Sequence, residues 1–480
     1  MADGGHGRTL QINMDDRGLS VVVFSLFFSW LLAFPFEGQI LYALASNFNL
    51  EPHGIIFGAI ASHFAGLFLC GAVIRTMRSA KRLMMSSIVC CILGTGVFFF
   101  APSVLWHIAL ILCAFLAGGC VAAWGFYLKS ATPQNERIKT VADGLIYSNL
   151  LMIILNMSAI HLSPYAGLAL SMLLLAAAFV FALRLPADGD KAAPSSSEQA
   201  DTRVSIIKPL IFLCLFIIII TINSGLMYQV LNPAFAHLEW LTSWYWAIPY
   251  IIALFVMRNL PPKTNRAYIL YVAIAMIGFS FIAFMSLDRS AASYLVVDTL
   301  MLGACGVYDL FWWSILGEML EFDRNPAKVF GIGLSSNVLG VLLGGLIGTA
   351  ITLAGGDSQN STLIALGVVC ITLVILPLLH KRLSVVLKDH VYLTVLSEMP
   401  PEEKSRFLNS TIALEQLTER ECEIANLLFR GKTYKAIAAE LHISENTVKT
   451  HIKNIYAKYK IQNRTELFNI MLEQRASINQ

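Results

Sequence analysis

Long apolar blocks recur along the 480-residue chain, and they restrict its fold more than any other feature. The blocks are roughly 17 to 27 residues long, close to the ~20 residues that an α-helix needs to cross the ~30 Å hydrocarbon layer of a bilayer. Only 14% of the residues are charged, whereas soluble domains carry about 25%. The chain is therefore predicted to be a polytopic membrane protein.

Twelve spans are predicted, in two groups of six, with ends that hydropathy fixes only to within several residues. The first group is 19–45, 55–74, 83–101, 104–128, 144–162 and 166–183, and the second is 209–231, 241–257, 267–285, 292–316, 329–354 and 363–379. The first block is too long for the apolar part of a secretory signal, so we expect it to be retained as a span.

The basic residues of the predicted loops indicate the orientation. Of the 22 Lys and Arg residues before position 400, 21 fall on one side if both termini are cytoplasmic, and only Arg289 falls on the other. Cytoplasmic loops of membrane proteins carry such an excess. The chain is therefore predicted to lie in the inner (cytoplasmic) membrane of a bacterial cell, with both termini in the cytoplasm.

A polar connector at 186–208 separates the two groups of spans and includes Ala-Pro-Ser-Ser-Ser at 193–197, which is typical of a flexible linker. Twelve spans with a long central loop resemble the major facilitator superfamily over about residues 19–380. The resemblance implies a six-plus-six helical bundle. The loop after the second span departs from that family's G-x-x-x-D-R-x-G-R-R pattern, because Gly71 is followed by Ala-Val-Ile and then Arg75, with no acidic residue.

Beyond the last span the pattern becomes that of small soluble helices. Thr418 and Glu421 have the spacing of a capping box, which predicts the start of a helix. A second helix fits 434–441, and a three-residue turn then places Ser444 as the N-cap of a third helix, 445 to about 459. Two short helices joined by such a turn are typical of a helix-turn-helix unit.

The residues of this unit carry a specific resemblance. The pattern is Leu417-Thr418-x-Arg420-Glu421-x-Glu423-Ile424, Gly431, Lys435-x-Ile437-Ala438-x-x-Leu441-x-Ile443-Ser444-x-x-Thr447-Val448-Lys449-x-His451, Lys458 and Ile461-x-x-Arg464-x-Glu466. It is similar to the LuxR/NarL-type DNA-binding domain across about 60 residues, in which the third helix enters the major groove of double-stranded DNA. The resemblance implies that Lys449, Thr450 and Lys453 face base edges or nearby phosphates. It also implies that Thr447 and Lys458 contact the sugar-phosphate backbone of the DNA.

Positive charge is concentrated on the same unit. From Lys432 to Arg464 there are seven basic and two acidic residues, although the whole chain carries only +3. Such a patch neutralises DNA phosphates and releases counterions. The alternatives are a solvated helical face or attraction to anionic lipid, and the helix-turn-helix spacing favours DNA. A short fourth helix is predicted from about Asn463.

Three acidic residues within the predicted spans, Glu37, Asp298 and Asp309, are candidate ligand-binding groups. Ionisable residues inside a membrane are costly and usually have a partner or a function. Asp298 and Asp309 are eleven residues apart, or three helical turns, so they share a helix face. The resembled superfamily lines its central cavity with spans one, four, seven and ten, which implies a small molecule there, apolar or cationic, with Trp312 among the aromatic walls. The alternatives are structural hydrogen bonds for the acids and interhelical packing for the aromatic residues.

Other kinds of site are not predicted. Eight of the nine cysteines lie in apolar blocks and no C-x-x-C occurs, so we expect neither a metal site nor a disulfide. No phosphate-binding glycine loop, H-E-x-x-H or G-x-S-x-G sequence is present, so we expect no enzyme activity and no cofactor. Gly340, Gly344 and Gly348 repeat at four-residue spacing, which predicts close helix packing.

The predicted fold class is all-α, a polytopic twelve-helix membrane bundle followed by a small four-helix LuxR-type unit. The predicted parts are a cytoplasmic tail 1–18, membrane half one 19–185, a linker 186–208, membrane half two 209–380, a cytoplasmic stalk 381–413 and a DNA-binding domain 414–480. The predicted function is a membrane-bound one-component transcriptional regulator that senses a small molecule, with a dimer expected on DNA. The alternatives are a secondary active transporter with an appended regulatory DNA-binding domain, and a lipid-anchoring module.

Overall fold

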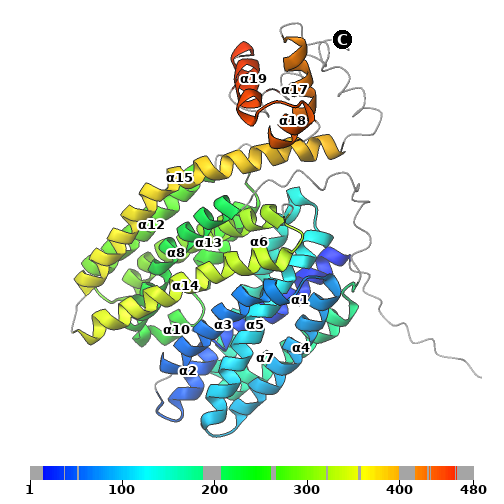
Figure 1. The fold of residues 1–480 in the computed structure, drawn as a ribbon. Helices are drawn as coiled ribbons and strands as arrows, with labels where there is room; N and C mark the ends of the chain where they lie inside the picture. The colour runs from blue at the N-terminus through cyan, green and yellow to red at the C-terminus, as the bar shows by residue number, and fades with distance from the viewer. Residues whose placement is uncertain are drawn as a thin grey trace, which may run out of the picture. The chain divides into compact units, whose positions relative to one another are not determined.

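The structure is a computed structural model, and it describes residues 15–36, 38–50, 53–187, 207–260, 266–320, 323–354, 358–398, 417–429, 432, 434–459, 461 and 467. All regular elements within these ranges are helices, as predicted (Figure 1). The chain divides into two units. We call Met1–Lys191 with Ile211–Pro377 the membrane unit, and Ala192–Leu210 with Leu378–Gln480 the C-terminal unit.

The first half of the membrane unit contains seven helices. They are α1 (Asp16–Ala33), α2 (Gln39–Ser46), α3 (His53–Val73), α4 (Met77–Gly96), α5 (Val104–Ala131), α6 (Arg137–His161) and α7 (Pro164–Arg184). Polar N-caps begin several of them: Asp15 accepts from the backbone N–H of Gly18, and Thr76 and Ser79 form a capping box. These side chains satisfy backbone donors that have no partner inside the helix.

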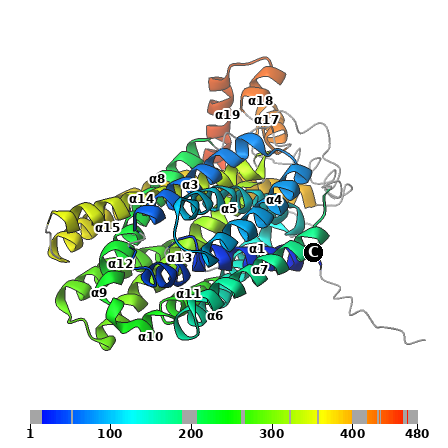
Figure 2. The same cartoon turned by 90° about the horizontal axis from the view of Figure 1, so that it is seen from below.

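The second half runs alongside the first in one bundle (Figures 1 and 2). Its elements are α8 (Ile207–Leu226), the π-helical turn η3 (Met227–Leu231), α9 (Asn232–Ala234), the 3-10 turn η4 (Ala236–Leu238), α10 (Glu239–Thr242), α11 (Ala247–Arg258), α12 (Arg266–Ser286), α13 (Ala291–Met319), α14 (Pro326–Leu353) and α15 (Ser358–Glu398).

Eleven of these helical segments are long and apolar enough to cross a membrane, and the count is twelve if one bent pair forms a single span. That pair is Ala236–Thr242 with Ala247–Arg258, bent by 46°. The protein is thus a multi-pass membrane protein, and the prediction of one continuous helix over 241–257 is wrong at its start.

The predicted first span, 19–45, is not one helix, because α1 ends at Ala33 and α2 begins only at Gln39. Pro35 lies in the break and has no backbone N–H to continue the helix. A Cβ on Gly38 would lie 2.0 Å from the carbonyl oxygen of Ala33, so the tight turn after the break requires glycine.

The glycine repeat lets α14 pack closely on α8, which confirms the predicted role. A Cβ on Gly340 would lie 2.0 Å from the hydroxyl of Thr221, and one on Gly344 would lie 2.1 Å from the carbonyl oxygen of Ile222. Helix backbones can approach this closely in a membrane only where the side chains between them are small.

The C-terminal unit contains three described short helices, α17 (Glu419–Phe429), α18 (Tyr434–Glu440) and α19 (Glu445–Lys458). They agree with the predicted helices to within one residue at each end. Ten apolar residues form their core: Ile424, Ala425, Leu427, Leu428, Ile437, Ala438, Val448, Ile452, Ile455 and Leu467. The fourth helix predicted from Asn463 falls on residues outside the described ones.

Helix α15 continues beyond its membrane span. The apolar part is Gln359–Leu379, and the helix runs without a break to Glu398. The first part of the predicted stalk, 381–398, is therefore helical. The rest of the stalk, 399–413, lies outside the described residues.

Candidate functional site

Helix α19 begins at a polar cap that follows a tight turn. His442 adopts a left-handed backbone conformation with φ of 53°, which turns the chain between α18 and α19. The Ser444 hydroxyl then accepts a hydrogen bond from the backbone N–H of Thr447 at 3.0 Å. This is the N-cap that the sequence predicts, and it fixes where the third helix starts.

The buried stripe of α19 faces the core and leaves its polar residues exposed. Val448, Ile452 and Ile455 are the buried residues. The residues predicted to contact DNA, Thr447, Lys449, Thr450 and Lys453, are all exposed. One face of the helix is therefore available to a partner, as the recognition helix of a helix-turn-helix domain requires.

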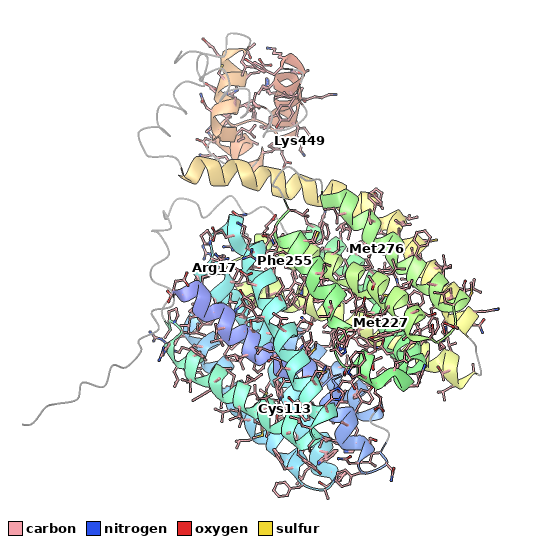
Figure 3. The ribbon with its side chains drawn as sticks, turned by 180° about the vertical axis from the view of Figure 1, so that it is seen from behind. Arg17, Cys113, Met227, Phe255, Met276 and Lys449 are labelled. Atoms are coloured by element: carbon pink, nitrogen blue, oxygen red, sulfur yellow. The ribbon has the colours of Figure 1, made fainter. Side chains whose placement is uncertain are left out.

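These exposed side chains differ in their local partners. The ammonium group of Lys449 lies 2.7 Å from the carboxylate of Glu445, one turn earlier, and the Lys449 side chain is 52% exposed. Figure 3 shows Lys449 on α19. The Thr450 hydroxyl donates to the carbonyl oxygen of Asn446. Among the described residues, Lys453 forms no salt bridge, so its positive charge is the more available of the two lysines.

Lys458 has a contact within the unit that the sequence analysis missed. Its Nζ donates to Glu421 Oε2 at 2.5 Å, and so ties the end of α19 to the start of α17. Glu421 also accepts from the backbone N–H and the hydroxyl of Thr418, which completes the predicted capping box. Burial opposes ionisation of Glu421, yet the hydrogen bonds from Lys458 and Thr418 hold its pKa below the usual value.

In the membrane unit, two predicted ligand-binding residues lie together. Asp309 accepts a hydrogen bond from the hydroxyl of Tyr250 at 2.9 Å and from Nε1 of Trp312 at 3.2 Å. The hydroxyl of Tyr308, the residue next to Asp309 on α13, lies 2.6 Å from the hydroxyl of Ser224 on α8. The polar groups of α8, α11 and α13 therefore meet inside the second half.

The other predicted acids are not part of this cluster. Asp298 lies on α13 as expected, is 5% exposed, and has a buried carboxylate oxygen with no hydrogen-bond partner among the described residues. Glu37 lies outside the described residues. Asn223 on α8 is 1% exposed, and neither atom of its amide is hydrogen-bonded to a described residue. Sequence analysis missed Asn223 because it sought charged groups only.

One end of the membrane unit is rich in basic residues. We call it the basic end, the end at which α3, α5, α11 and α13 finish and α4, α6 and α14 begin. Lys129 donates to the carbonyl oxygens of Leu320 and Asp323, at 2.7 and 3.1 Å. Arg137 donates to the carbonyl oxygen of Gly317 at 3.0 Å. The first half thus satisfies free carbonyl groups at the C-terminus of α13 in the second half.

A reciprocal contact runs from the second half to the first. The amide Nδ2 of Asn325, the N-cap of α14, donates to the carbonyl oxygens of Gly71 and Ile74, at 2.7 and 2.9 Å. These carbonyls lie at the C-terminal end of α3. Each half of the bundle therefore donates hydrogen bonds to carbonyl groups at the end of a helix in the other half.

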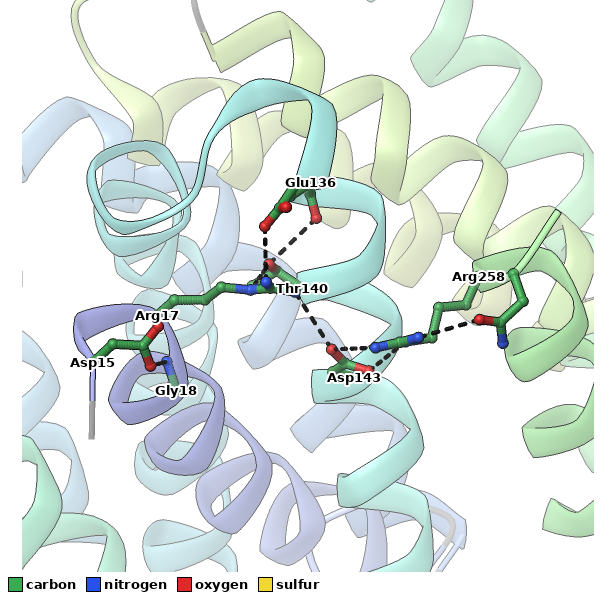
Figure 4. Close-up of polar contacts among 8 residues, drawn as sticks. Asp15, Arg17, Gly18, Glu136, Thr140, Asp143 and Arg258 are labelled. Atoms are coloured by element: carbon green, nitrogen blue, oxygen red, sulfur yellow. Dashed lines mark hydrogen bonds and ion pairs between the residues drawn. The ribbon is translucent and has the colours of Figure 1, made fainter. Parts of the chain in front are cut away.

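An ion-pair network also joins the halves at the basic end (Figure 4). Arg258 on α11 makes a two-point contact with Asp143 on α6, at 2.6 and 3.1 Å. Arg17 at the start of α1 lies 3.6 Å from the same carboxylate and donates to Glu136 and Thr140, both at 2.8 Å. Asp143 thus forms an ion pair with an arginine from each half.

An aromatic layer lies next to these polar contacts along the same helices. Phe24 of α1 stacks on Trp124 of α5, with ring centroids 4.2 Å apart. Trp124 in turn contacts Trp313 of α13 and Phe330 of α14, at 6.4 and 6.1 Å. These residues lie within about three turns of the helix ends at the basic end. The two halves are therefore in contact there through a polar layer and an aromatic layer.

Comparisons with known proteins divide along the same two parts of the chain. Residues 415–471 match the family model described as bacterial regulatory proteins, luxR family. The same region is 51% identical over 51 residues to the monoamine regulon transcriptional regulator of Klebsiella aerogenes, and 48% identical over 52 residues to the response regulator protein VraR of Staphylococcus aureus. Each match covers 11% of this chain, and it spans 22% and 25% of those relatives' lengths.

The membrane part resembles solved transporter structures. The human organic anion transporter MFSD10 has a TM-score of 0.58 at 16% identity, covering 75% of this chain and 98% of that one. A bacterial homologue of the iron transporter ferroportin in an outward-facing state also has a TM-score of 0.58 at 16% identity, covering 78% and 100%. The Escherichia coli fucose:proton symporter FucP has a TM-score of 0.52 at 18% identity. The chain thus combines a membrane unit with the fold of major facilitator transporters and a C-terminal helix-turn-helix domain of the LuxR family.

Proposed function

We propose that the protein is a membrane-bound one-component transcription regulator, in which a small molecule bound by the membrane unit controls DNA binding by the C-terminal unit. The observation that carries this proposal is that one chain contains both a membrane unit with the transporter fold and a helix-turn-helix domain of the LuxR family. Helix α15 contains the last span, Gln359–Leu379, and extends to Glu398. In this proposal, a ligand-dependent change in the last span alters the segment that follows it.

The proposal requires the C-terminal unit to share a compartment with the chromosome. The excess of basic residues at one end of the bundle supports a cytoplasmic location for that end. We accordingly place the protein in the inner membrane with both termini in the cytoplasm. LuxR-type domains commonly act as dimers, so we further propose that DNA is bound by a homodimer at an imperfect inverted repeat.

The candidate ligand-binding groups are the polar side chains of the second half. Asp309 supplies an acidic acceptor beside Tyr250 and Trp312. The amide of Asn223 has unused donors and acceptors among the described residues. Polar atoms buried without partners are costly unless a ligand or water satisfies them. A small molecule with a hydrogen-bond donor or a cationic group beside an apolar body fits these groups.

Regulation by such a ligand requires two arrangements of the membrane unit that bind it unequally. Contacts at the basic end define one arrangement, in which the halves touch through Lys129, Asn325 and Asp143. Complete switching needs an affinity difference of about 5.5 kcal/mol, and partial regulation needs less.

The test is genome-wide mapping of the DNA bound by the full-length protein in cells, with and without candidate ligands. We expect a small set of sites whose occupancy changes with one ligand and falls in the variant Lys453→Ala. In Asp309→Asn the sites should remain but lose the ligand response. Gly367→Ala is the control, because a Cβ at Gly367 meets no atom within 4 Å. Occupancy without sequence preference would refute the regulator assignment.

A reconstitution experiment separates sensing from transport. The purified protein in liposomes should bind the ligand identified by the mapping but should not concentrate it. Concentrative uptake that is lost in Asp309→Asn would instead show a secondary transporter with a regulatory domain, and would contradict the proposal of a dedicated sensor.

A further inference from the structure

A cavity of about 530 Å³ lies at the basic end between α3 and α14. Its walls include Phe68, Ala72 and Arg75 from α3 and the residues just after it, and Arg324, Lys328 and Ile332 from α14 and the residues just before it. Helix α3 belongs to the first half and α14 to the second. An occupant of this cavity would therefore touch both halves.

The charge of the walls is positive. Arg75, Arg324 and Lys328 line the cavity together with one acidic residue, Asp323. The Lys328 ammonium lies 3.9 Å from the Asp323 carboxylate and stays 56% exposed. Arg75 and Arg324 are exposed and form no salt bridge with another described residue. Two guanidinium groups are thus left without a counter-charge on the described part of the chain.

The start of α14 adds to this positive potential. Pro326 is its first residue, and Asn325 caps it by accepting from the backbone N–H of Lys328. The N-terminus of a helix carries a partial positive charge, which favours an anion nearby. Guanidinium groups match the oxygens of a phosphate in geometry as well as in charge.

The remaining walls are apolar. Phe68 is 51% exposed, and Ala72 and Ile332 lie beside it in the lining. An anionic group among the cations would therefore have apolar surface adjoining it. Such a surface accommodates an acyl chain, and equally the carbon part of a soluble phosphate ester.

We propose that this cavity binds a phosphate group, held by Arg75, Arg324 and Lys328, with the attached carbon chain against Phe68 and Ile332. Binding there stabilises the contact between the halves, because the phosphate is held by residues from both. The proposal concerns the membrane unit alone and does not depend on the proposed regulatory function.

The experiment measures lipid retention by the purified full-length protein, using native mass spectrometry. Dioleoyl phosphatidylglycerol and dioleoyl phosphatidylcholine are offered in equal amounts, and water-soluble glycerol phosphate is then added as a competitor. The test variant is Arg75→Gln with Arg324→Gln. Arg75→Lys with Arg324→Lys keeps the charge, and Arg184→Gln removes an exposed arginine from the end of α7 instead.

The wild type should retain phosphatidylglycerol in preference to phosphatidylcholine. Each neutralised arginine should weaken retention about fivefold, since a basic residue near an anionic surface contributes about 1 kcal/mol. The double Lys variant and Arg184→Gln should behave like the wild type. Displacement by millimolar glycerol phosphate would support the site with a soluble phosphate ester as its occupant, and resistance to displacement would support the lipid.

Equal retention of the two lipids, or a double Gln variant that retains phosphatidylglycerol as the wild type does, would overturn the proposal. So would an equal loss in Arg184→Gln, because the effect would then be one of overall charge. The single variants Arg75→Gln and Arg324→Gln provide the same readout if the double variant folds poorly.

Discussion

At the scale of residues, the two exposed lysines of α19 should make different contributions to DNA binding. Lys453 has no salt bridge among the described residues, whereas Lys449 is paired with Glu445. We expect Lys453→Ala to weaken binding to all sequences about equally and to reduce the salt dependence by about one phosphate contact. Lys449→Ala should instead relax sequence preference, at a cost of about 1–3 kcal/mol for the preferred site.

Fluorescence anisotropy over a range of salt concentrations, with a mapped site and a scrambled duplex, distinguishes these outcomes. Glu445→Gln serves as the control, because it frees Lys449 without removing it. An unchanged footprint in both lysine variants would contradict the assignment of α19 as the recognition helix that enters the major groove.

The pair formed by Lys458 and Glu421 should make the stability of the C-terminal unit depend on pH. The folded unit lowers the pKa of Glu421, so the folded state binds this proton less tightly than the unfolded state. The stabilisation is therefore complete at neutral pH and is lost as the pH falls through the usual carboxyl range to the lower folded pKa.

Replacing the lysine tests the same pair. Lys458→Met should destabilise the unit by about 2 kcal/mol, because the buried Glu421 carboxylate loses its ammonium partner. The loss should shrink as the pH falls through the usual carboxyl range to the lower folded pKa, because Glu421 becomes protonated over that range. Hydrogen exchange of α17 and α19 in the full-length protein, corrected for intrinsic rates, measures both effects. The exposed pair Arg420 and Glu423 provides the control variant Glu423→Gln.

At the scale of elements, the contact between α8 and α14 should not tolerate a methyl group. A Cβ on Gly344 would lie 2.1 Å from the carbonyl oxygen of Ile222 and 2.9 Å from the Cα of Gly225. Both are backbone atoms, so Gly344→Ala must separate the helices, at a cost of about 1–3 kcal/mol. Its melting temperature in detergent should fall, while that of the control Gly367→Ala should not. Equal melting temperatures would show that the helices move apart freely.

Local signals explain why the short helices were predicted well. The Thr418 and Glu421 capping box and the Ser444 cap act within three residues of the helix starts that they determine. A window of sequence therefore contains the whole interaction. The break after Ala33 was missed because hydropathy averages over the apolar block and hides Pro35.

Long-range contacts explain why the candidate sites were predicted only in part. Asp309 and Trp312 are three residues apart on one helix, so their pairing follows from helical spacing. The contact of Asp309 with Tyr250, and that of Lys458 with Glu421, join residues 59 and 37 positions apart. Such pairs depend on how helices pack, which a single sequence does not reveal.

At the scale of the whole molecule, the contact between Asp143 and Arg258 should stabilise the packing of the two halves against each other at the basic end. The ion pair is bidentate, and the side chains of Asp143 and Arg258 are only 16% and 28% exposed. The pair is therefore shielded from solvent more than a typical surface ion pair. Asp143→Asn or Arg258→Gln should each destabilise the closed basic end by about 1–3 kcal/mol. The start of α6 and the end of α11 should then exchange their amide hydrogens faster.

The double variant decides whether the two residues act together. If the two residues form one interaction, the amide hydrogens of the double variant Asp143→Asn with Arg258→Gln should exchange no faster than those of the more damaging single variant. The reason is that the same contact is lost in all three variants. Arg17→Gln is the internal reference, since Arg17 contacts Asp143 from within the first half. Additive effects of the two substitutions would mean that Asp143 and Arg258 stabilise their own halves separately. The closed arrangement would then depend on the contacts of Lys129, Arg137 and Asn325 and on the aromatic layer.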